Sequence, residues 1–461
     1  MKFNITIIII SFIFFSILCH SCKNQESASL YFNYGEVDIT PDESVTLSGY
    51  ANRLHDSQGI HAPLTSRCLV LKEKRNLLCL IVNDLVGISD SMYQAILDEI
   101  TGETDIDEKA IIITSIHTHS APVFEYGISK ANDRYTKYAF AKIVDNAIKT
   151  ILTDQSFEKG FIRTGTGSCG INAQRKLIVP NDGSPAYRIS DPEGIRDKQV
   201  NILQIQDAKG NNRVALFNYA CHPVTLGYKS IIVSPDFPGK AREFIENTWG
   251  GHAIFLNGAA GDLNPIKDNI TDTQITDSMG EDLGNAVISA EMKNSKPGIQ
   301  INLKSGSILI PFRDQQITKE FIHNEVERKS KEVTEFIFWK DALLNWEKQL
   351  SRQIDLNEIK KDFSFDIKVL NMGSLIFFFT QGEAFVKYQL ELKKRFPDKQ
   401  IFFVGYCFGE DTYIPSSEAF LENGYETTQA YIFEGLPSPV SNRIEEIYLN
   451  KAEDIIQSLL K

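Results

Sequence analysis

The sequence predicts an α/β fold with mixed, partly parallel β-sheets flanked by helices, formed by a single large domain. Strand-like apolar runs alternate with helical patterns along most of the 461 residues, and strands separated by helices favour a partly parallel sheet. Hydrophobic residues make up 42% of the chain, which is enough for a large core. No segment with the composition of a linker follows residue 30. We therefore expect one continuous domain after the N-terminal segment.

Seven apolar runs are predicted to be buried strands. They occupy residues 68–71, 77–82, 110–116, 213–219, 253–256, 375–380 and 401–404. Helical periodicity predicts helices over 91–100, 135–152, 238–248 and 278–292, and one more between the last two strands. A charged, helix-favouring insertion occupies about 316–352, before the last two strands. We expect it to form a helical hairpin or lid, or else a solvated surface helix with an apolar stripe.

The N-terminus is predicted to be an export signal. Lys2 precedes an apolar stretch over residues 5–19, which is shorter than the roughly 20 residues of a transmembrane helix. Cys22 follows a small serine and precedes polar residues, a pattern that resembles a bacterial lipoprotein signal. We expect a signal peptide over 1–21, lipidation of Cys22 and a polar tether over 22–30. The protein is then exported and lipid-anchored to a membrane of the bacterial cell envelope; an ordinary cleaved signal and a secreted protein are the alternative.

Charge and cysteine content exclude several classes of function. The formal net charge is −12 and no Lys/Arg run occurs, so a nucleic-acid partner is not expected, because such binding depends on neutralised phosphates. Seven cysteines without a Cys-x-x-Cys spacing provide neither a disulfide scaffold nor a zinc knuckle. Cys68 and Cys79 lie in neighbouring predicted strands. Two buried thiols are favoured there over a disulfide.

Three of the eight histidines directly follow predicted strands. His117 and His119 come after the strand at 110–116, and their i, i+2 spacing puts both rings on one face of an extended segment. His222 follows the strand at 213–219. Paired imidazoles at the carboxyl ends of strands suit a zinc site. The alternative for His222 is a hydrogen-bonded histidine in the turn before Pro223.

Two more polar loops follow apolar strands. Residues 257–265 form a small-residue loop that brings backbone N–H groups close to a ligand. Glu383 follows the aromatic strand at 375–380. Its carboxylate is either a metal ligand or a neighbour of a helix N-terminus, and the pattern alone does not choose between them.

Together, these motifs resemble the catalytic domain of the neutral/alkaline (non-lysosomal) ceramidase family. The matching segments include 115–122, which contains His-Thr-His-Ser, 220–223, which contains Cys-His-Pro, and the loop at 258–265. The others are 37–41, 47–51, 59–61, 234–236, 382–383 and 413–425. All occur in one order from about residue 35 to about residue 430, which makes the resemblance specific. It assigns residues 31–461 to a ceramidase-like zinc hydrolase domain.

The resemblance implies an amidohydrolase with one Zn²⁺ per chain, which cleaves the amide bond of a ceramide-like N-acyl lipid with a zinc-activated water. Its zinc ligands are His117, His222, Glu383 and Tyr413. Tyr425 lies twelve residues after Tyr413, as the second tyrosine of the family does. By the same resemblance, His119, Arg175 and Tyr425 line the reacting centre, where they stabilise the oxyanion and protonate the leaving amine.

One position departs from the family pattern. Ceramidases of the family carry a serine, treated as catalytic, in a Gly-Asp-x-Ser-Pro motif, whereas this chain has Asn264 there. Asparagine is not a nucleophile, so we expect its amide to face the zinc pocket and orient a water or the substrate carbonyl; a purely structural turn is the alternative. The departure leaves two further functions open: a zinc hydrolase of another amide or ester, and a surface lipoprotein that binds a ligand without turnover.

Overall fold

The computed structural model describes residues 29–153, 156–178, 187–295, 300–332, 334, 336–409 and 412–461. The predicted signal peptide and Cys22 lie outside these residues, as does most of the predicted tether. Among the described helices, none combines the length and the apolar character needed to cross a membrane.

The larger part of the fold is a nine-stranded mixed sheet. Its order is β10-β9-β8-β5-β1-β2-β3-β4, and β12 pairs with β5. Only β9–β10 and β3–β4 are parallel among these neighbours. The strands are β1 (Ser29–Asp38), β2 (Thr65–Glu73), β3 (Asn76–Asn83), β4 (Ile111–Ser115), β5 (Glu158–Ser168), β8 (Gln199–Gln206), β9 (Asn212–Tyr219), β10 (His252–Asn257) and β12 (Lys293–Asn294).

A second, four-stranded sheet has the order β13-β14-β15-β17, with β15 and β17 parallel. Two small sheets, β11-β6-β7 and β16-β18, lie near the site described below. The strands are β13 (Asn302–Pro311), β14 (Asp362–Met372), β15 (Leu375–Thr380), β17 (Gln400–Val404), β6 (Asn172–Ile178), β7 (Tyr187–Asp191), β11 (Leu263–Pro265), β16 (Glu383–Ala384) and β18 (Tyr413–Ile414).

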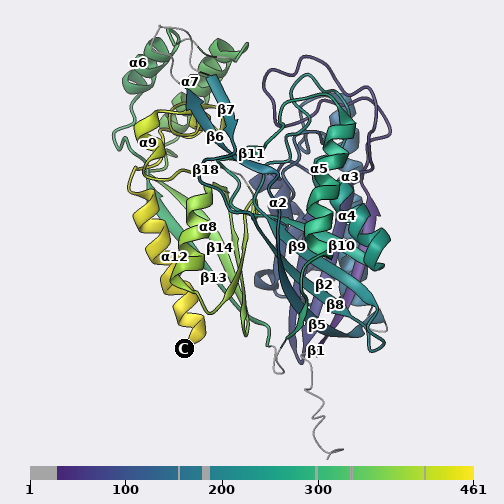
Figure 1. Ribbon diagram of the computed structural model, residues 1–461. Helices are drawn as coiled ribbons and strands as arrows, with labels where there is room; N and C mark the ends of the chain where they lie inside the picture. The colour runs from purple at the N-terminus through teal and green to yellow at the C-terminus, as the bar shows by residue number, and fades with distance from the viewer. Residues whose placement is uncertain are drawn as a thin grey trace, which may run out of the picture.

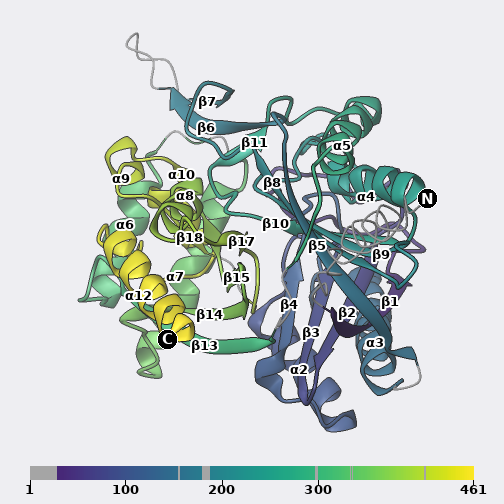
Figure 2. The same ribbon diagram turned by 60° about the horizontal axis from the view of Figure 1, so that its bottom comes forward.

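Helices cover the outer faces of the two large sheets, so the molecule has four layers (Figure 1). Helices α3, α4 and α5 lie outside the nine-stranded sheet, and α8 and α12 lie outside the second sheet, as both views show (Figure 2). The helices are α2 (Asp90–Glu103), η1 (Glu108–Ala110), α3 (Lys130–Leu152), α4 (Asp236–Trp249), α5 (Thr273–Ile288), α6 (Lys319–Lys329), α7 (Trp339–Asp355), α8 (Val386–Arg395), α9 (Ala419–Glu422), α10 (Tyr425–Thr428), α11 (Ala430–Phe433) and α12 (Ile444–Leu460).

The fold class is confirmed, and each predicted strand and helix is present. The helix predicted over 278–292 begins and ends earlier, as α5, because Asp272 caps its N-terminus by accepting from the Gln274 N–H. The predicted insertion contains two helices, α6 and α7, in a hairpin. The sequence prediction lacks strands β1, β5, β8, β13 and β14 and the shorter strands β6, β7, β11, β12, β16 and β18.

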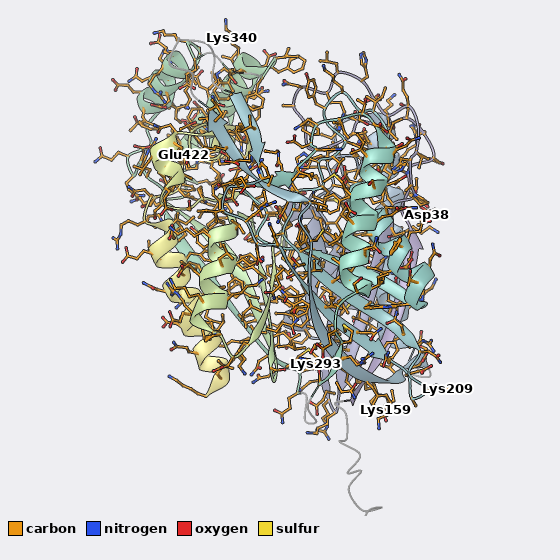
Figure 3. All side chains as sticks on the ribbon, in the orientation of Figure 1. Asp38, Lys159, Lys209, Lys293, Lys340 and Glu422 are labelled. Carbon is orange, nitrogen blue, oxygen red and sulfur yellow. The ribbon has the colours of Figure 1, made fainter. Side chains whose placement is uncertain are left out.

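A shared core makes the two large sheets one domain. Phe217 of β9 and Phe377 and Phe402 of the second sheet belong to the same buried apolar cluster, and side chains fill the region between the sheets (Figure 3). The amide of Asn218 in β9 donates to the Phe403 carbonyl of β17 at 2.8 Å. The five described cysteines are free, and the Sγ atoms of Cys68 and Cys79 are 3.6 Å apart, as two buried thiols.

Candidate active site

The candidate site lies where strands β4 and β9 of the nine-stranded sheet end. His117 follows the end of β4 and His222 follows the end of β9. Glu383 follows β15 of the second sheet. The two sheets meet near these strand ends, because the Gly405 N–H after β17 donates to the carbonyl of Asn257, the last residue of β10. Site residues that are far apart in sequence are thereby brought together.

His117 is held in one orientation by its backbone and its ring. Its φ of 70° is left-handed, and its N–H donates to the Leu85 carbonyl at 3.0 Å. The ring Nδ1 lies 2.6 Å from the Val86 carbonyl, and the ring stacks on Tyr406 with centroids 4.1 Å apart. Because a carbonyl only accepts, Nδ1 carries the hydrogen and Nε2 offers a lone pair.

His222 is fixed in the same way. Its Nδ1 lies 2.6 Å from the Ala260 carbonyl, and its backbone N–H donates to the Leu263 carbonyl at 2.8 Å. The side chain is buried. Its Nε2 is again the free acceptor, which is the tautomer a metal-binding histidine needs.

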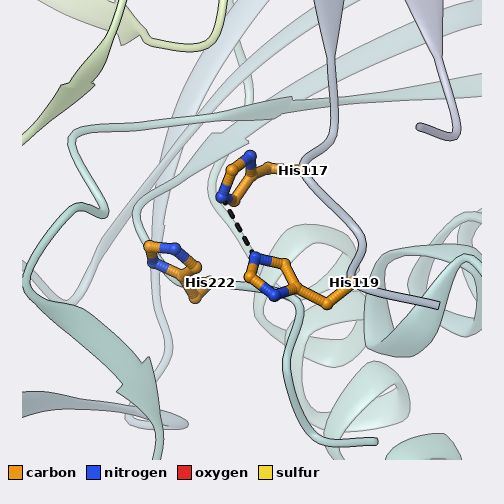
Figure 4. A group of neighbouring side chains, drawn as sticks. All are labelled: His117, His119 and His222. Atoms are coloured by element: carbon orange, nitrogen blue, oxygen red, sulfur yellow. Dashed lines mark hydrogen bonds between the residues drawn. The ribbon is translucent and has the colours of Figure 1, made fainter. Parts of the chain in front are cut away.

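His119 joins the same cluster. Its Nε2 lies 3.2 Å from the Nε2 of His117, and one nitrogen from each of His117, His119 and His222 lies within 4.8 Å of the others. Figure 4 shows the three rings converging. The resemblance assigns His119 to catalysis and not to the metal; its position in the structure is compatible with either role.

Glu383, in the short strand β16 that follows β15, completes the cluster. Its Oε2 lies 3.1 Å from the Nε2 of His222 and 3.4 Å from that of His117. The close approach depends on Gly261, whose N–H donates to the Ala384 carbonyl at 2.9 Å. A Cβ at Gly261 would lie only 2.4 Å from the Glu383 carbonyl oxygen. The small side chains of the loop after β10 therefore allow this loop to contact the backbone of Glu383 and Ala384.

The donor set fits a metal ion. Within the described part of the chain, His222 Nε2 and Glu383 Oε2 are buried and neither makes a hydrogen bond of acceptable geometry, although they lie 3.1 Å apart. Buried polar atoms are rarely left in that state. A cation bound between these nitrogen and oxygen atoms would give them the partner that they lack. Imidazole nitrogens and a carboxylate oxygen are typical ligands of zinc.

The protonation states agree with this fit. Burial lowers the pKa of His119 and of His222, and so keeps their imidazoles neutral. Burial alone opposes ionisation of Glu383; positive charge at His117 and His222 lowers the pKa of that carboxyl well below its usual range, and a cation bound at the same point would act in the same direction. A metal site needs neutral imidazoles and an ionised carboxylate.

A second group of residues lies beside this cluster. Tyr413 pairs with Glu383 across β16 and β18, and its ring lies 5.6 Å from the Arg175 guanidinium and 6.0 Å from the Tyr425 ring. Burial would lower the pKa of Arg175, but Tyr413 and Glu426 raise it. Burial, reinforced by Glu383, raises the pKa of Tyr413. The predicted residues Arg175, Tyr413 and Tyr425 are therefore together.

Asn264 also lies at the site, in β11 beside β6. It is buried, and its Nδ2 donates to the Asp268 carboxylate at 2.6 Å. The structure thus places all eight residues predicted for metal binding and catalysis in one region. It also shows that the Asn264 NH₂ group already has a partner, which the sequence does not reveal.

Three further residues of this region are absent from the prediction. Glu426 forms an ion pair with Arg175 at 2.9 Å. Tyr406 stacks on His117, and the ring of Tyr50 lies 5.0 Å from that of His119. Tyr50 lies within the matched segment 47–51 and Glu426 directly follows Tyr425. A family motif in the sequence therefore lies at or beside each of these two residues. Tyr406 had none, because it reaches the site through a left-handed backbone turn, with φ of 59°.

Comparison with known proteins gives the family of this fold and site. Neutral ceramidase from Pseudomonas aeruginosa is 25% identical over 252 residues, which cover 51% of this chain and 37% of that protein. Neutral ceramidase B from Dictyostelium discoideum is 25% identical over 263 residues, covering 53% and 36% respectively. The aligned parts thus span little more than a third of these relatives' length.

A crystal structure of the Pseudomonas aeruginosa neutral ceramidase has a similar fold. It matches with a TM-score of 0.66 and 17% identity, covering 93% of this chain and 74% of that one. The family model described as "Neutral/alkaline non-lysosomal ceramidase, N-terminal" matches residues 32–353, more than half of the chain. The chain therefore belongs to the neutral/alkaline non-lysosomal ceramidase family.

Proposed function

We propose that this protein is a zinc-dependent hydrolase that cleaves the amide bond of a ceramide-like N-acyl lipid. The observation that carries the proposal is the convergence of His117 Nε2, His222 Nε2 and Glu383 Oε2 on one point in a chain of this family. Tyr413, beside Glu383, is the proposed fourth ligand. A zinc ion held there would supply a Lewis acid for activating water and polarising a carbonyl group.

The surrounding residues have separate proposed roles. Arg175 carries a positive charge beside Tyr413, where it stabilises negative charge that develops on the amide oxygen. Tyr425 keeps its proton, because burial raises its pKa, and it donates to the leaving amine. His119 is neutral and assists this proton transfer. Glu426 holds Arg175 in place through their ion pair.

The substrate class rests on the relatives named neutral ceramidase. One observation favours a second candidate, a hydrolase of another amide or ester on the same zinc site. Asn264 stands where the family pattern has serine, and its side chain bonds to Asp268. This change alters the surface offered to the substrate and leaves the proposed ligands intact.

We also propose that the protein is exported and lipid-anchored through Cys22. In that case the anchor attaches far from the site. Residues Ser29 to Phe32 of β1 pair with the first residues of β5, and Lys159 there lies at the opposite end of the sheet from Asp38 (Figure 3). The site lies at the Asp38 end, where β4 also stops. We expect Cys22→Ser to release the protein from membranes without reducing its kcat/KM on a short-chain soluble substrate, as fractionation and kinetics will show.

Metal analysis combined with a substrate panel tests the proposal. We expect one zinc per purified chain and hydrolysis of a short-chain ceramide faster than of simple amides or esters. His222→Ala is expected to lose both the zinc and the activity. His323→Ala is the matched control, because that histidine lies on α6 with 62% of its side chain exposed, and it should retain both. A chain that binds zinc but prefers another amide or ester would establish the second candidate.

A further inference from the structure

The side-chain amide of Asn264 is fixed by one neighbour. Its Nδ2 donates to Asp268 Oδ2 at 2.6 Å, and Asn269 Nδ2 donates to the same oxygen at 3.2 Å. An ionised carboxylate only accepts hydrogen bonds, so the NH₂ end of Asn264 must face Asp268. The carbonyl oxygen Oδ1 therefore points away from Asp268.

The strand pairing shows which side Asn264 faces. Leu263 of β11 packs with Ala220 and Val386 in a small apolar cluster. Neighbouring residues of a strand face opposite sides, so Asn264 faces away from that cluster. Asn264 pairs with Ala173 of β6, and Arg175, two residues further along β6, lies on the same face. Asn264 and Arg175 thus share the face that lies toward Tyr413.

The oxygen of Asn264 has no donor in the described chain. Its Oδ1 is buried and accepts no hydrogen bond there, and only 7% of the residue is exposed. A buried acceptor without a donor is unfavourable. An acceptor of this kind beside Arg175 is therefore suited to a hydrogen-bond donor that arrives with the substrate.

We propose that Asp268 is a positioning residue that holds Asn264 with its carbonyl oxygen toward the active site. Asn264 then selects a substrate with a hydroxyl or N–H donor next to the scissile amide. The inference rests on the proposed function and deepens it. It concerns the Oδ1 acceptor of Asn264, whereas the expectation from the sequence used this residue to orient a water or the substrate carbonyl. A serine hydroxyl can donate, whereas this oxygen can only accept.

The test compares matched substrates. One arm uses a short-chain ceramide and its O-methyl ethers, which lack hydroxyl donors; the other uses the secondary amide and its N-methyl form. We expect wild type to lose at least about tenfold in kcat/KM in one arm, because a site built around a donor discriminates against analogues without it. In Asn264→Ala the loss in that arm should shrink to about twofold. A loss with the O-methyl ethers identifies a hydroxyl as the donor, and a loss with the N-methyl amide identifies the amide N–H.

Variants of Asp268 separate positioning from simple contact. Asp268→Ala should weaken the same discrimination, because the Asn264 amide is then free to turn. Asp268→Asn should restore it, because its amide oxygen still accepts from Nδ2 of Asn264. Asn269→Gly removes the other donor to Asp268 at a position with φ of 54°, which glycine tolerates, and should behave as wild type.

Two results would overturn the inference. One is equal discrimination by wild type and Asn264→Ala in both arms. The other is an Asp268→Ala variant that discriminates as wild type does. If the zinc-loaded wild type cleaves no amide, the proposed function fails, and calorimetric Kd values for the same substrate pairs then decide the inference. A preference for the donor-bearing member that Asn264→Ala abolishes would support it, and equal Kd ratios would refute it.

Discussion

At the scale of single residues, two backbone carbonyls fix the orientation and the tautomer of the site histidines. The Val86 and Ala260 carbonyls each hold the Nδ1 of a histidine, which leaves the Nε2 atoms of His117 and His222 to face Glu383. These carbonyls belong to loops whose positions depend on the whole fold. The sequence therefore predicted which histidines form the site, because their spacing after strands is local. It could not predict their tautomers or the role of Tyr406.

The roles of ligand and catalyst can be separated by substitution. We expect Glu383→Gln to lose bound zinc, since it removes the carboxylate charge shared by His117 and His222. His119→Ala and Tyr425→Phe are expected to keep the zinc and lose about 10²–10³-fold in kcat, the usual loss for a positioned acid or oxyanion donor. Zinc content and kcat measured on the same samples check this. Loss of zinc from His119→Ala would make His119 a ligand, which its distance of 3.2 Å from His117 permits.

We expect the buried carboxyl of Asp262 to make the free energy of unfolding depend on pH. Burial raises the pKa of its carboxyl to about 7, although the Val386 N–H and Arg175 act in the opposite direction. The raised folded-state pKa favours folding below the unfolded value of about 3.9, and that contribution is lost as the pH rises to about 7. We expect Asp262→Asn to remove this dependence and still accept from the Val386 N–H, which now bonds at 2.7 Å.

Denaturant titrations at several pH values check the Asp262 prediction. The two proteins should have similar unfolding free energies near pH 4. Near pH 8 the variant should be more stable by about 1–4 kcal/mol, the order expected for a shift of this size. Equal pH dependence of the two proteins between pH 4 and pH 8 would show that Asp262 is ionised in the folded state at all these pH values.

At the scale of elements, the strands that the sequence failed to predict pair over long distances. Strand β5 contains three glycines, which are unusual in strands. A Cβ at Gly160 would lie 2.4 Å from the Ile205 side chain, and one at Gly167 would lie 2.2 Å from the Ala286 carbonyl. These glycines are required by neighbours more than 40 residues away in sequence. Local periodicity does not reveal such a requirement, whereas continuous apolar runs such as β15 are evident.

The hairpin of α6 and α7 is anchored by an aromatic residue. Trp346 is 1% exposed, its Nε1 donates to the Leu436 carbonyl at 2.7 Å, and its ring contacts Tyr431. We expect Trp346→Ala to lower the unfolding free energy by about 3–5 kcal/mol, as for other large core truncations. Hydrogen exchange should quicken over 319–355 while the zinc content stays unchanged.

Leu344→Ala is the control for this helix, because Leu344 lies on α7 and is 58% exposed. It should change the unfolding free energy by less than about 0.5 kcal/mol. If both variants lose stability equally, the loss does not come from the buried indole, because alanine favours the helix at both positions. The contact between Phe336 and Tyr425, with ring centroids 5.3 Å apart, links this hairpin to the proposed catalytic tyrosine.

At the scale of the whole molecule, the site exists only because two sheets meet. His117 and His222 follow strands of the nine-stranded sheet, and Glu383, in β16, follows β15 of the second sheet. The sequence predicted the members of the site through ordered motifs and a family resemblance. The arrangement of the sheets could not be predicted from local patterns, because it depends on hydrogen bonds such as those of Asn218, between elements more than 180 residues apart.

Asn218 therefore provides a test of the joined architecture. It is buried, and its Nδ2 donates both to Leu256 of β10 and to Phe403 of β17, at 2.9 and 2.8 Å. Asn218→Ala leaves these two carbonyls without their donor, and buried unsatisfied groups cost about 1–3 kcal/mol each. We expect a lower unfolding temperature and lower zinc retention, since the two halves of the metal site are less firmly held together. Asn294→Ala, in the exposed strand β12, should leave both unchanged.

Because the apolar cluster spans both sheets, calorimetry of wild type and of the Asn218→Ala variant should each show one cooperative transition. Two separate transitions in wild type would mean that the sheets fold as independent domains, and that the zinc site forms only after they dock.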